Sequence, residues 1–390
     1  MKKSKALLSL LSMMLCAVFM FTAFSSNLFG EPTPADINVN GAKGRLKEIG
    51  NGLFNMFSEN SEENSNAKSS QIPETYVYLG GYPIGLKLYA DGVIVVGTEV
   101  VDTANGNVNP AEKAGLEIGD IIKKVNGNEV AKNSDVSDII EKSAGEEIHF
   151  VIKRGEKESG VVFRAEFSVS ENKYKAGIWI RDSSAGIGTV TFCTQDGYFA
   201  SLGHAVCDID TKATLPISEG ECCEAKITGY IKGENGTAGE LCGFLENKRT
   251  GYVYSNEEKG VYGSFDKVPN DKTLLPIARK NEVKTGEAEI YTTVQDGVIE
   301  KYTVNIERVD KHSADNKNLT VKVTDAELIR RTGGIIQGMS GSPIVQNGKI
   351  VGAVTHVFLN ESTGGYGIFA ETMLDNLASI SENAKLQNAS

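Results

Sequence analysis

The chain is poor in the residues that metal and nucleic-acid chemistry would need. Its 390 residues include only four histidines and one tryptophan, and acidic residues outnumber basic ones, which gives a formal net charge of −11. A nucleic-acid partner would favour a basic face, so none is expected. The sequence also lacks a phosphate-cradling glycine loop and a Cys/His cluster with metal-ligand spacing. We therefore expect no metal and no cofactor.

Cysteine is also sparse and badly spaced for a disulfide framework. One of the six cysteines, Cys16, lies in an apolar N-terminal run, and its flanks are not those of a lipoprotein acceptor. The other five are odd in number and irregular in spacing, which argues against paired bridges. Cys207 follows His204 by three residues and could in principle be a nucleophile, but a free cysteine is more often a buried packing residue.

One long apolar run occurs, and it lies at the N-terminus. A basic start, MKKSK, is followed by a mostly apolar stretch over residues 6–24. This pattern is typical of an export signal, and the run is near the length that spans a bilayer. Residues 1–30 are therefore predicted to be a signal peptide or an uncleaved membrane anchor. Residues 31–74 are loop-like and polar, and are expected to form a flexible linker.

Residues 75–170 carry a long motif, NPAEKAGLEIGDIIKKVNG at 109–127, which resembles the core of bacterial PDZ domains. Ser134 is expected to cap a helix that has Val136 and Ile140 on one face. PDZ domains bind extended peptides by strand addition. The predicted groove lies between this helix and the strand that contains Ile84, Gly85 and Leu86. A packing module without peptide affinity is the alternative.

The motif GMSGSP at residues 338–343 places a serine between glycines at a tight turn, and the hairpin signal Asn347-Gly348 follows. Gly338 and Gly341 allow the backbone angles that such a turn demands. A nucleophilic Ser340 would need this geometry, with the N–H groups of Gly338 and Ser340 directed at a reacting carbonyl oxygen. A glycine-rich turn with surface serines is the alternative, and Ser342 is a second candidate nucleophile.

Of the four histidines, His204 best fits a general base. It ends an apolar strand beside a glycine and precedes Ser340 by 136 residues, which suits two β-barrels that each contribute one wall of a cleft. The order of His before Ser matches chymotrypsin. His149 is predicted to be a surface residue and His312 a loop residue. His356 could line the cleft, but a structural role is favoured.

The acid of a triad is not determined by spacing. Asp325 follows an alternating strand and could instead cap the short helix that comes next. The other candidates that lie between or near the base and the nucleophile are Asp208, Asp210, Asp266, Asp296 and Asp310.

Residues 175–385 are rich in short β-type runs separated by glycine and Asn/Asp turns. A helix over residues 371–380 is expected to pack Met373, Leu374 and Leu377. The predicted fold is thus mainly β. It is a chymotrypsin-like double β-barrel protease domain preceded by an α+β PDZ domain.

Taken together, these motifs resemble the stage IV sporulation protein B family of PDZ-containing serine peptidases. The densest matches are residues 180–189, residues 202–204 and residues 332–344. The resemblance implies a serine endopeptidase with His204 as base and Ser340 as nucleophile. It also implies Asp325 as the acid, much nearer to the nucleophile than in chymotrypsin.

The resemblance further implies a role in endospore formation. Such a peptidase is exported across the forespore membrane into the intermembrane space. There it cleaves itself and a regulator of a membrane-embedded complex that processes a sigma-factor precursor. Two other functions remain open from the residues. One is a PDZ-type quality-control protease, and the other is a PDZ peptide-binding scaffold on an inactive protease barrel.

Overall fold

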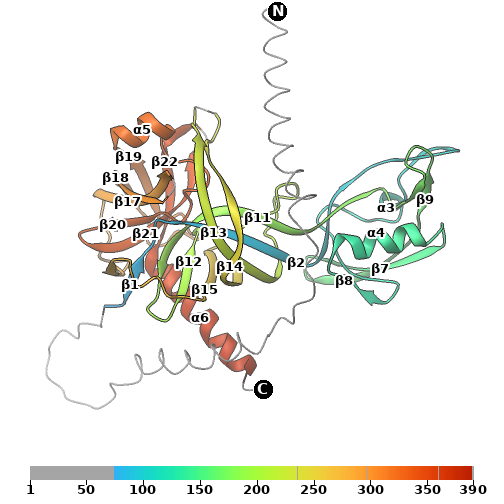
Figure 1. Cartoon of the computed structure of the whole chain (residues 1–390), viewed down its shortest axis with the longest axis horizontal. Helices are drawn as coiled ribbons and strands as arrows, with labels where there is room; N and C mark the ends of the chain where they lie inside the picture. The colour runs from blue at the N-terminus through green and yellow to red at the C-terminus, as the bar shows by residue number, and fades with distance from the viewer. Residues whose placement is uncertain (1–73, 235, 296, 359, 389–390) are drawn as a thin grey trace, which may run out of the picture. The chain divides into compact units, whose positions relative to one another are not determined.

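The computed structural model describes residues 74–388 except 235, 296 and 359, with the backbone alone for 381–388 (Figure 1). The described residues from Glu74 to Asn383 belong to one compact unit. The predicted export signal and nearly all of the predicted linker lie outside the described residues. Within the described part of the chain, no helix is both long and apolar enough to cross a bilayer.

Six strands close into a first barrel. Pairing runs from β2 through β11, β12, β15, β14 and β13 and returns to β2. Two short strands, β1 and β16, extend this sheet at β11. The barrel encloses buried apolar side chains that include Leu86, Leu88, Val190, Phe199 and Val261. The strands are β1 (Tyr76–Leu79), β2 (Pro83–Thr98), β11 (Ile178–Cys193), β12 (Tyr198–Ser201), β13 (Ile217–Ile231), β14 (Glu240–Glu257), β15 (Gly260–Phe265) and β16 (Leu274–Pro276).

A second barrel closes in the order β17, β18, β19, β22, β21, β20. Asn347 and Gly348 both have positive φ between β20 and β21, which are the angles of a type I′ hairpin turn. The strands are β17 (Gly286–Gln295), β18 (Val298–Val309), β19 (Leu319–Val323), β20 (Pro343–Gln346), β21 (Lys349–Phe358) and β22 (Glu361–Phe369). The prediction of a mainly β protein with two barrels is confirmed.

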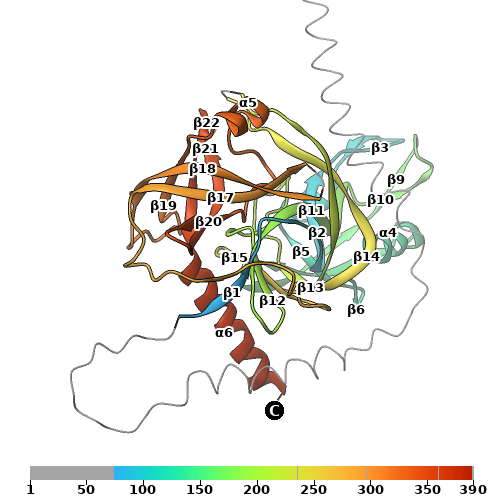
Figure 2. The ribbon, with the colours of Figure 1, turned by 60° about the vertical axis from the view of Figure 1, so that its left-hand side comes forward.

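Two helices accompany the second barrel. The short helix α5 (Ala326–Thr332) follows β19 and ends at Gly333, whose φ of 80° is left-handed. The C-terminal helix α6 (Ala370–Asn388) runs on directly from β22 (Figure 2). It buries Met373 and Leu377, as the sequence predicted, whereas Leu374 is only partly buried. Its Asn376 Nδ2 donates to Glu257 Oε2 of the first barrel at 2.8 Å.

The PDZ unit surrounds a separate core that includes Val93, Ile122, Val125, Phe150 and Phe163. Its sheet pairs the later part of β2 with β5, then β7 and β8. The remaining elements are α3 (Pro110–Lys113), α4 (Asn133–Lys142), β3 (Val101–Thr103), β4 (Gly106–Val108), β5 (Ile121–Val125), β6 (Asn128–Glu129), β7 (Glu147–Arg154), β8 (Lys157–Arg164), β9 (Glu166–Ser168) and β10 (Lys173–Lys175).

The start of α4 differs from the prediction. Ser134 lies inside the helix rather than capping it, because the helix begins at Asn133 with Lys132 at the cap position. Asp135 satisfies this end of the helix instead, since its carboxylate accepts hydrogen bonds from the N–H groups of Ala131 and Lys132.

The strand predicted to form one side of the PDZ peptide groove is not available to a peptide in the structure. Ile84, Gly85 and Leu86 have no free strand edge, because β11 pairs with them on one side and β13 on the other. Their side of β2 belongs to the first barrel, where Ile84 and Leu86 are buried. Strand addition needs unpaired N–H and C=O groups, so these three residues cannot receive a peptide.

Val136 and Ile140 of α4 are core residues rather than groove residues. Both are buried in the PDZ core. Ile178 and Ile180 of β11 pack against that same core from the chain's own strand. At the PDZ end of β2, Ile180 and Arg181 of β11 pair with Val95 and Ile94. Strand β11, and not residues 84–86, therefore lies beside α4.

Candidate active site

The turn that carries Ser340 lies between α5 and β20. Gly338 and Gly341 have φ values of 92° and 96°, in the left-handed region that favours glycine. The Ser340 hydroxyl is partly exposed and donates a hydrogen bond to the Thr355 carbonyl at 2.6 Å. Ser342 is fully buried, and its hydroxyl has no partner among the described residues. Ser340 is therefore the serine that a substrate can reach.

The turn presents two free N–H groups. Within the described residues, neither the Gly338 nor the Ser340 N–H has a hydrogen-bond acceptor, whereas the Met339, Gly341 and Ser342 N–H groups bond to backbone carbonyls. Two unpaired N–H groups beside a serine hydroxyl form the donor set that stabilises a tetrahedral oxyanion. These are the two N–H groups predicted to form an oxyanion hole, and that role stays a prediction.

Strand β11 of the first barrel holds this turn in place. The Thr189 N–H donates to the Ser340 carbonyl at 3.1 Å, and the Thr189 hydroxyl donates to the Gly338 carbonyl at 2.8 Å. The Thr191 hydroxyl donates to the Gly341 carbonyl at 2.8 Å. These bonds occupy three carbonyls of the turn and tie it to the first barrel. Sequence analysis missed both threonines, because only tertiary pairing brings β11 to the turn.

His204 comes from the loop that follows β12. The Gly203 N–H donates to the Ser201 carbonyl at 2.7 Å, and Leu202 between them has φ of 62°. A bulky residue with positive φ is a strained conformation of the kind that clusters at functional sites. The same loop packs against the nucleophile turn, since a Cβ on Gly341 would lie 2.5 Å from the Leu202 nitrogen.

The His204 ring has a defined tautomer. Its Nδ1 lies 2.8 Å from the Ala205 carbonyl oxygen. A carbonyl only accepts hydrogen bonds, so Nδ1 carries the proton and Nε2 keeps its lone pair. Burial lowers the pKa of His204, against an opposing effect of the Ala205 carbonyl. The residue is thus a neutral base near neutral pH. Its bonded nitrogen is not the one that must take the proton of Ser340.

The base and the nucleophile lie on adjacent loops but are not yet bonded to each other. Gly203 packs closely against Thr355, where a Cβ would meet the threonine side chain at 2.8 Å. Thr355 in turn accepts the Ser340 hydrogen bond. The predicted attack would need the Ser340 hydroxyl to turn from the Thr355 carbonyl toward His204 Nε2.

The ring of His356 lies against that of His204. The ring centroids are 4.8 Å apart, at an interplanar angle of 39°. Burial and then the charge of His204 lower the pKa of His356. The other two histidines lie on the surface and in a loop, as predicted. His149 is exposed beside Glu147, and His312 is exposed in a turn after β18.

Asp325 binds the start of helix α5 in the structure. Its carboxylate caps α5 by accepting the N–H groups of Glu327 and Leu328 at 2.9 and 3.1 Å, and it accepts the Thr303 N–H at 3.3 Å. Among the described residues it has no hydrogen bond to His204. The structure thus shows Asp325 as the cap of the short helix, which was the alternative role for this residue.

The other candidate acids are also engaged elsewhere. Asp208 is buried in an ion pair with Arg181, which also binds Asp210. Asp310 pairs with Arg308, and Asp266 lies 4.0 Å from Arg249. Asp296 lies outside the described residues. Within the described chain, no carboxylate forms a hydrogen bond with His204.

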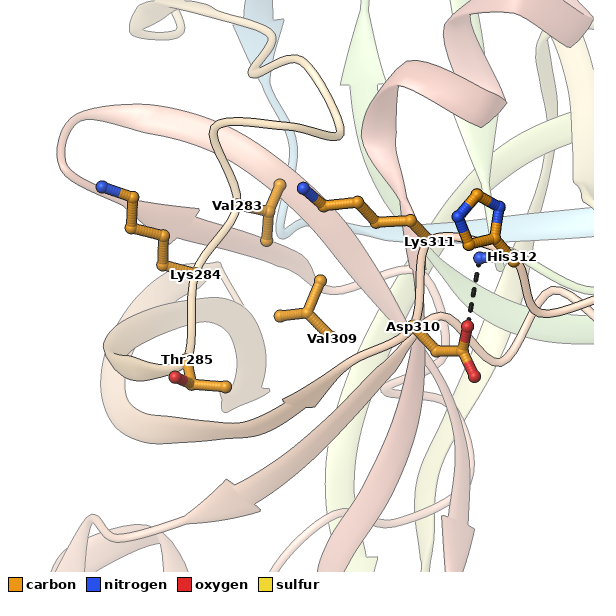
Figure 3. A pocket seen from close by; sticks show the side chains of 7 residues that line it. All are labelled: Val283, Lys284, Thr285, Val309, Asp310, Lys311 and His312. Carbon is orange, nitrogen blue, oxygen red and sulfur yellow. Dashed lines mark hydrogen bonds between the residues drawn. The ribbon is translucent and has the colours of Figure 1, made fainter.

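A surface hollow of about 600 Å³ lies on the second barrel, away from this chemistry (Figure 3). In it the His312 N–H donates to Asp310 Oδ1 at 3.0 Å. Neither His204 nor Ser340 lines it; its lining residues are Val283, Lys284, Thr285, Val309, Asp310, Lys311 and His312.

The described residues offer no cluster of three or more His, Cys, Asp and Glu side chains that could hold a metal ion. The five described cysteines are free thiols. Burial raises the pKa of the Cys193 thiol, and raises that of Cys222 to about 12. These two thiols are therefore uncharged at neutral pH and poor nucleophiles. Cys207 is exposed, and its sulfur lies 3.9 Å from the Ala205 carbonyl.

Comparison with known proteins agrees with this geometry. The family model described as SpoIVB peptidase S55 matches residues 172–374, just over half of the chain. The chain belongs to the SpoIVB peptidase S55 family. A PDZ family model also matches, at residues 109–154. The chain therefore combines a peptidase S55 region with a PDZ domain, as the resemblance in its sequence implied.

Other similarities are shorter or more distant. Serine protease HTRA1 of Xenopus tropicalis is 51% identical over 49 residues, which is 13% of this chain and a tenth of that protein's length. The HtrA-type protease AlgW with a decapeptide matches at 11% identity and a TM-score of 0.32, over 52% of this chain and 55% of that one. The Rv3671c protease of M. tuberculosis matches at 15% identity and a TM-score of 0.31, over 50% and 74% of the two chains.

Proposed function

We propose that this SpoIVB-type peptidase is an exported serine endopeptidase of endospore formation that cleaves itself and one membrane-protein regulator. The observation that carries the proposal is the Ser340 turn, in which a reachable hydroxyl stands beside two unpaired N–H groups and the His204 loop. Family membership supports a peptide bond as the target, and the PDZ domain supports a protein substrate.

The chemical steps follow from the side chains present. Ser340 Oγ attacks the carbonyl of the substrate while His204 Nε2 takes its proton. The N–H groups of Gly338 and Ser340 stabilise the oxyanion of the tetrahedral intermediate. The imidazolium then gives its proton to the leaving amine, and water hydrolyses the acyl enzyme by the same steps.

The place of action belongs to the same proposal. The basic start and apolar run at residues 1–24 support export across the forespore membrane into the intermembrane space, with the N-terminal segment as a signal or an anchor. There the target would be the regulator of a membrane-embedded complex that processes a sigma-factor precursor. The sporulation role is supported by the name of the family.

The test compares the wild type with Ser340→Ala and Ser342→Ala by mass spectrometry after purification. We expect self-cleavage products in the wild type and in Ser342→Ala, and an intact chain in Ser340→Ala. A fluorophosphonate probe should label the wild type and not Ser340→Ala. Cleavage by Ser340→Ala at the wild-type rate would refute the assignment. A wild-type chain that is folded but never labelled would favour the PDZ scaffold on an inactive barrel.

A second candidate function is a PDZ-type quality-control protease, and the local similarity to serine protease HTRA1 supports only the serine-protease part of it. Unfolded casein separates the two. A sporulation peptidase of narrow specificity should leave casein intact while it cleaves one membrane-protein ectodomain. Rapid digestion of casein by the wild type, absent in Ser340→Ala, would support the quality-control function instead.

A further inference from the structure

We propose that His356 is a positioning residue for this peptidase, and that the contact of its ring holds the orientation of the His204 imidazole. The proposal rests on the proposed function and concerns one step of it, the transfer of the Ser340 proton to His204. It names a residue outside the predicted triad of His204, Asp325 and Ser340.

The first argument is contact. His356 is the one titratable side chain whose ring is found against His204 among the described residues. It follows Thr355 directly on β21, and the Thr355 carbonyl accepts the Ser340 hydrogen bond at 2.6 Å. Two consecutive residues of one strand thus contact the base and the nucleophile. A shift of this strand would move both partners together.

The second argument is the absence of a competing group. The Asp325 carboxylate is committed to the α5 cap and to Thr303. Asp208 and Asp210 are committed to Arg181. Among the described residues, the groups shown against the His204 ring are the Ala205 carbonyl, which fixes the tautomer, and the His356 ring.

The third argument is charge. The groups whose charges act on His356 are His204 and Lys317, which lower its pKa, and Asp315, which raises it; burial has the largest effect. The net effect lowers the pKa of His356 to about 4. A neutral His356 beside His204 has a lone pair to offer. It adds no positive charge next to the imidazolium that forms when Ser340 loses its proton.

The experiment replaces His356 with Ala, Phe and Gln in the full chain, with His312→Ala as the matched control on an exposed turn of the same barrel. The readouts are the melting temperature, kcat and KM for a cleaved peptide, and the pH profile. Positioning predicts a fall in kcat of about 10²-fold for His356→Ala with KM unchanged, since small misplacements cost that much. His356→Gln, which restores a hydrogen-bonding group, should recover part of the loss, and His356→Phe should not.

Two results would overturn the proposal. One is wild-type kcat in His356→Ala, and the other is full recovery by His356→Phe, which would reduce the role to packing. Phe and Gln fill the volume that Ala leaves, so they keep the test valid if the Ala variant does not fold. Ser340→Ala and His204→Ala are run in parallel. If both lose activity while His356→Ala keeps it, this proposal fails and the proposed function stands.

Discussion

Substitution of Asp325 by Asn separates a catalytic role from a capping role at one position. In the structure Oδ1 of Asp325 accepts the N–H groups of Glu327 and Leu328. Asparagine is about as good as aspartate at this position of a helix, because its amide oxygen accepts the same bonds. What changes is the second oxygen, which accepts the Thr303 N–H at 3.3 Å. An amide nitrogen placed there loses that bond.

The expected magnitude is small. One weak, partly exposed hydrogen bond contributes about 0.5–1 kcal/mol to the free energy of unfolding. The melting temperature should therefore fall by no more than about 4 °C, on the scale seen for domains of this size. Even if this whole loss of free energy also raised the activation barrier of catalysis, kcat would change by less than about tenfold. Asp325→Ala removes the cap as well and should cost about 1–2 kcal/mol.

The assay pairs a thermal melt with the rate of fluorophosphonate labelling for the wild type, Asp325→Asn and Asp325→Ala. We expect labelling by Asp325→Asn at close to the wild-type rate. A triad aspartate behaves differently, because its change to Asn costs about 10⁴-fold through the wrong histidine tautomer. A loss of that size with an unchanged melting temperature would refute our reasoning. It would mean that Asp325 reaches His204 in the active conformation.

Four further predictions concern Gly341, Arg181, Asp208 and His204. Gly341→Ala should abolish labelling, because its Cβ would lie 2.0 Å from the Thr189 carbonyl oxygen at a strained φ; wild-type labelling would contradict this. Arg181→Ala should lower the free energy of unfolding in a urea titration by about 3–5 kcal/mol, because it strands the buried Asp208; an unchanged midpoint would show that the pair is dispensable. Burial raises the pKa of Asp208, but the Thr211 N–H and Arg181 together lower it by more, so the net shift is downward. The stability that Asp208 provides is thus present above about pH 3.9 and lost as the pH falls through its lower folded value. Because burial lowers the pKa of His204, the acid limb of kcat/KM should lie below about 6.5, and a limb at or above that value would contradict it.

The parts of the site that the sequence predicted are those coded by short motifs. The Ser340 turn and the Asn347-Gly348 hairpin depend on glycines at positive φ, which are visible in one stretch of chain. His204 was found because it ends a strand beside a glycine. The buried face of α6, with Met373 and Leu377, follows from helical periodicity.

The parts that were missed depend on pairing between distant segments. The alternating pattern of residues 84–86 is that of a strand, but pattern does not say that β11 and β13 occupy both of its edges. The family resemblance implied Asp325 as the acid, but the helix that follows this residue engages its carboxylate. The contact of His356 with His204 joins two barrels, so no local signal could reveal it.

The bonds from Thr189 and Thr191 to the nucleophile turn have a consequence for assembly. Each barrel could fold around its own core, yet the two threonines belong to one half and the serine to the other. Catalytic competence is therefore a property of the docked pair, and it should arise late, only after the halves meet. If the chain is divided in the loop between β16 and β17, the separate fragments should not be labelled by the fluorophosphonate probe. Labelling should return when the two fragments recombine. Activity would then report docking itself.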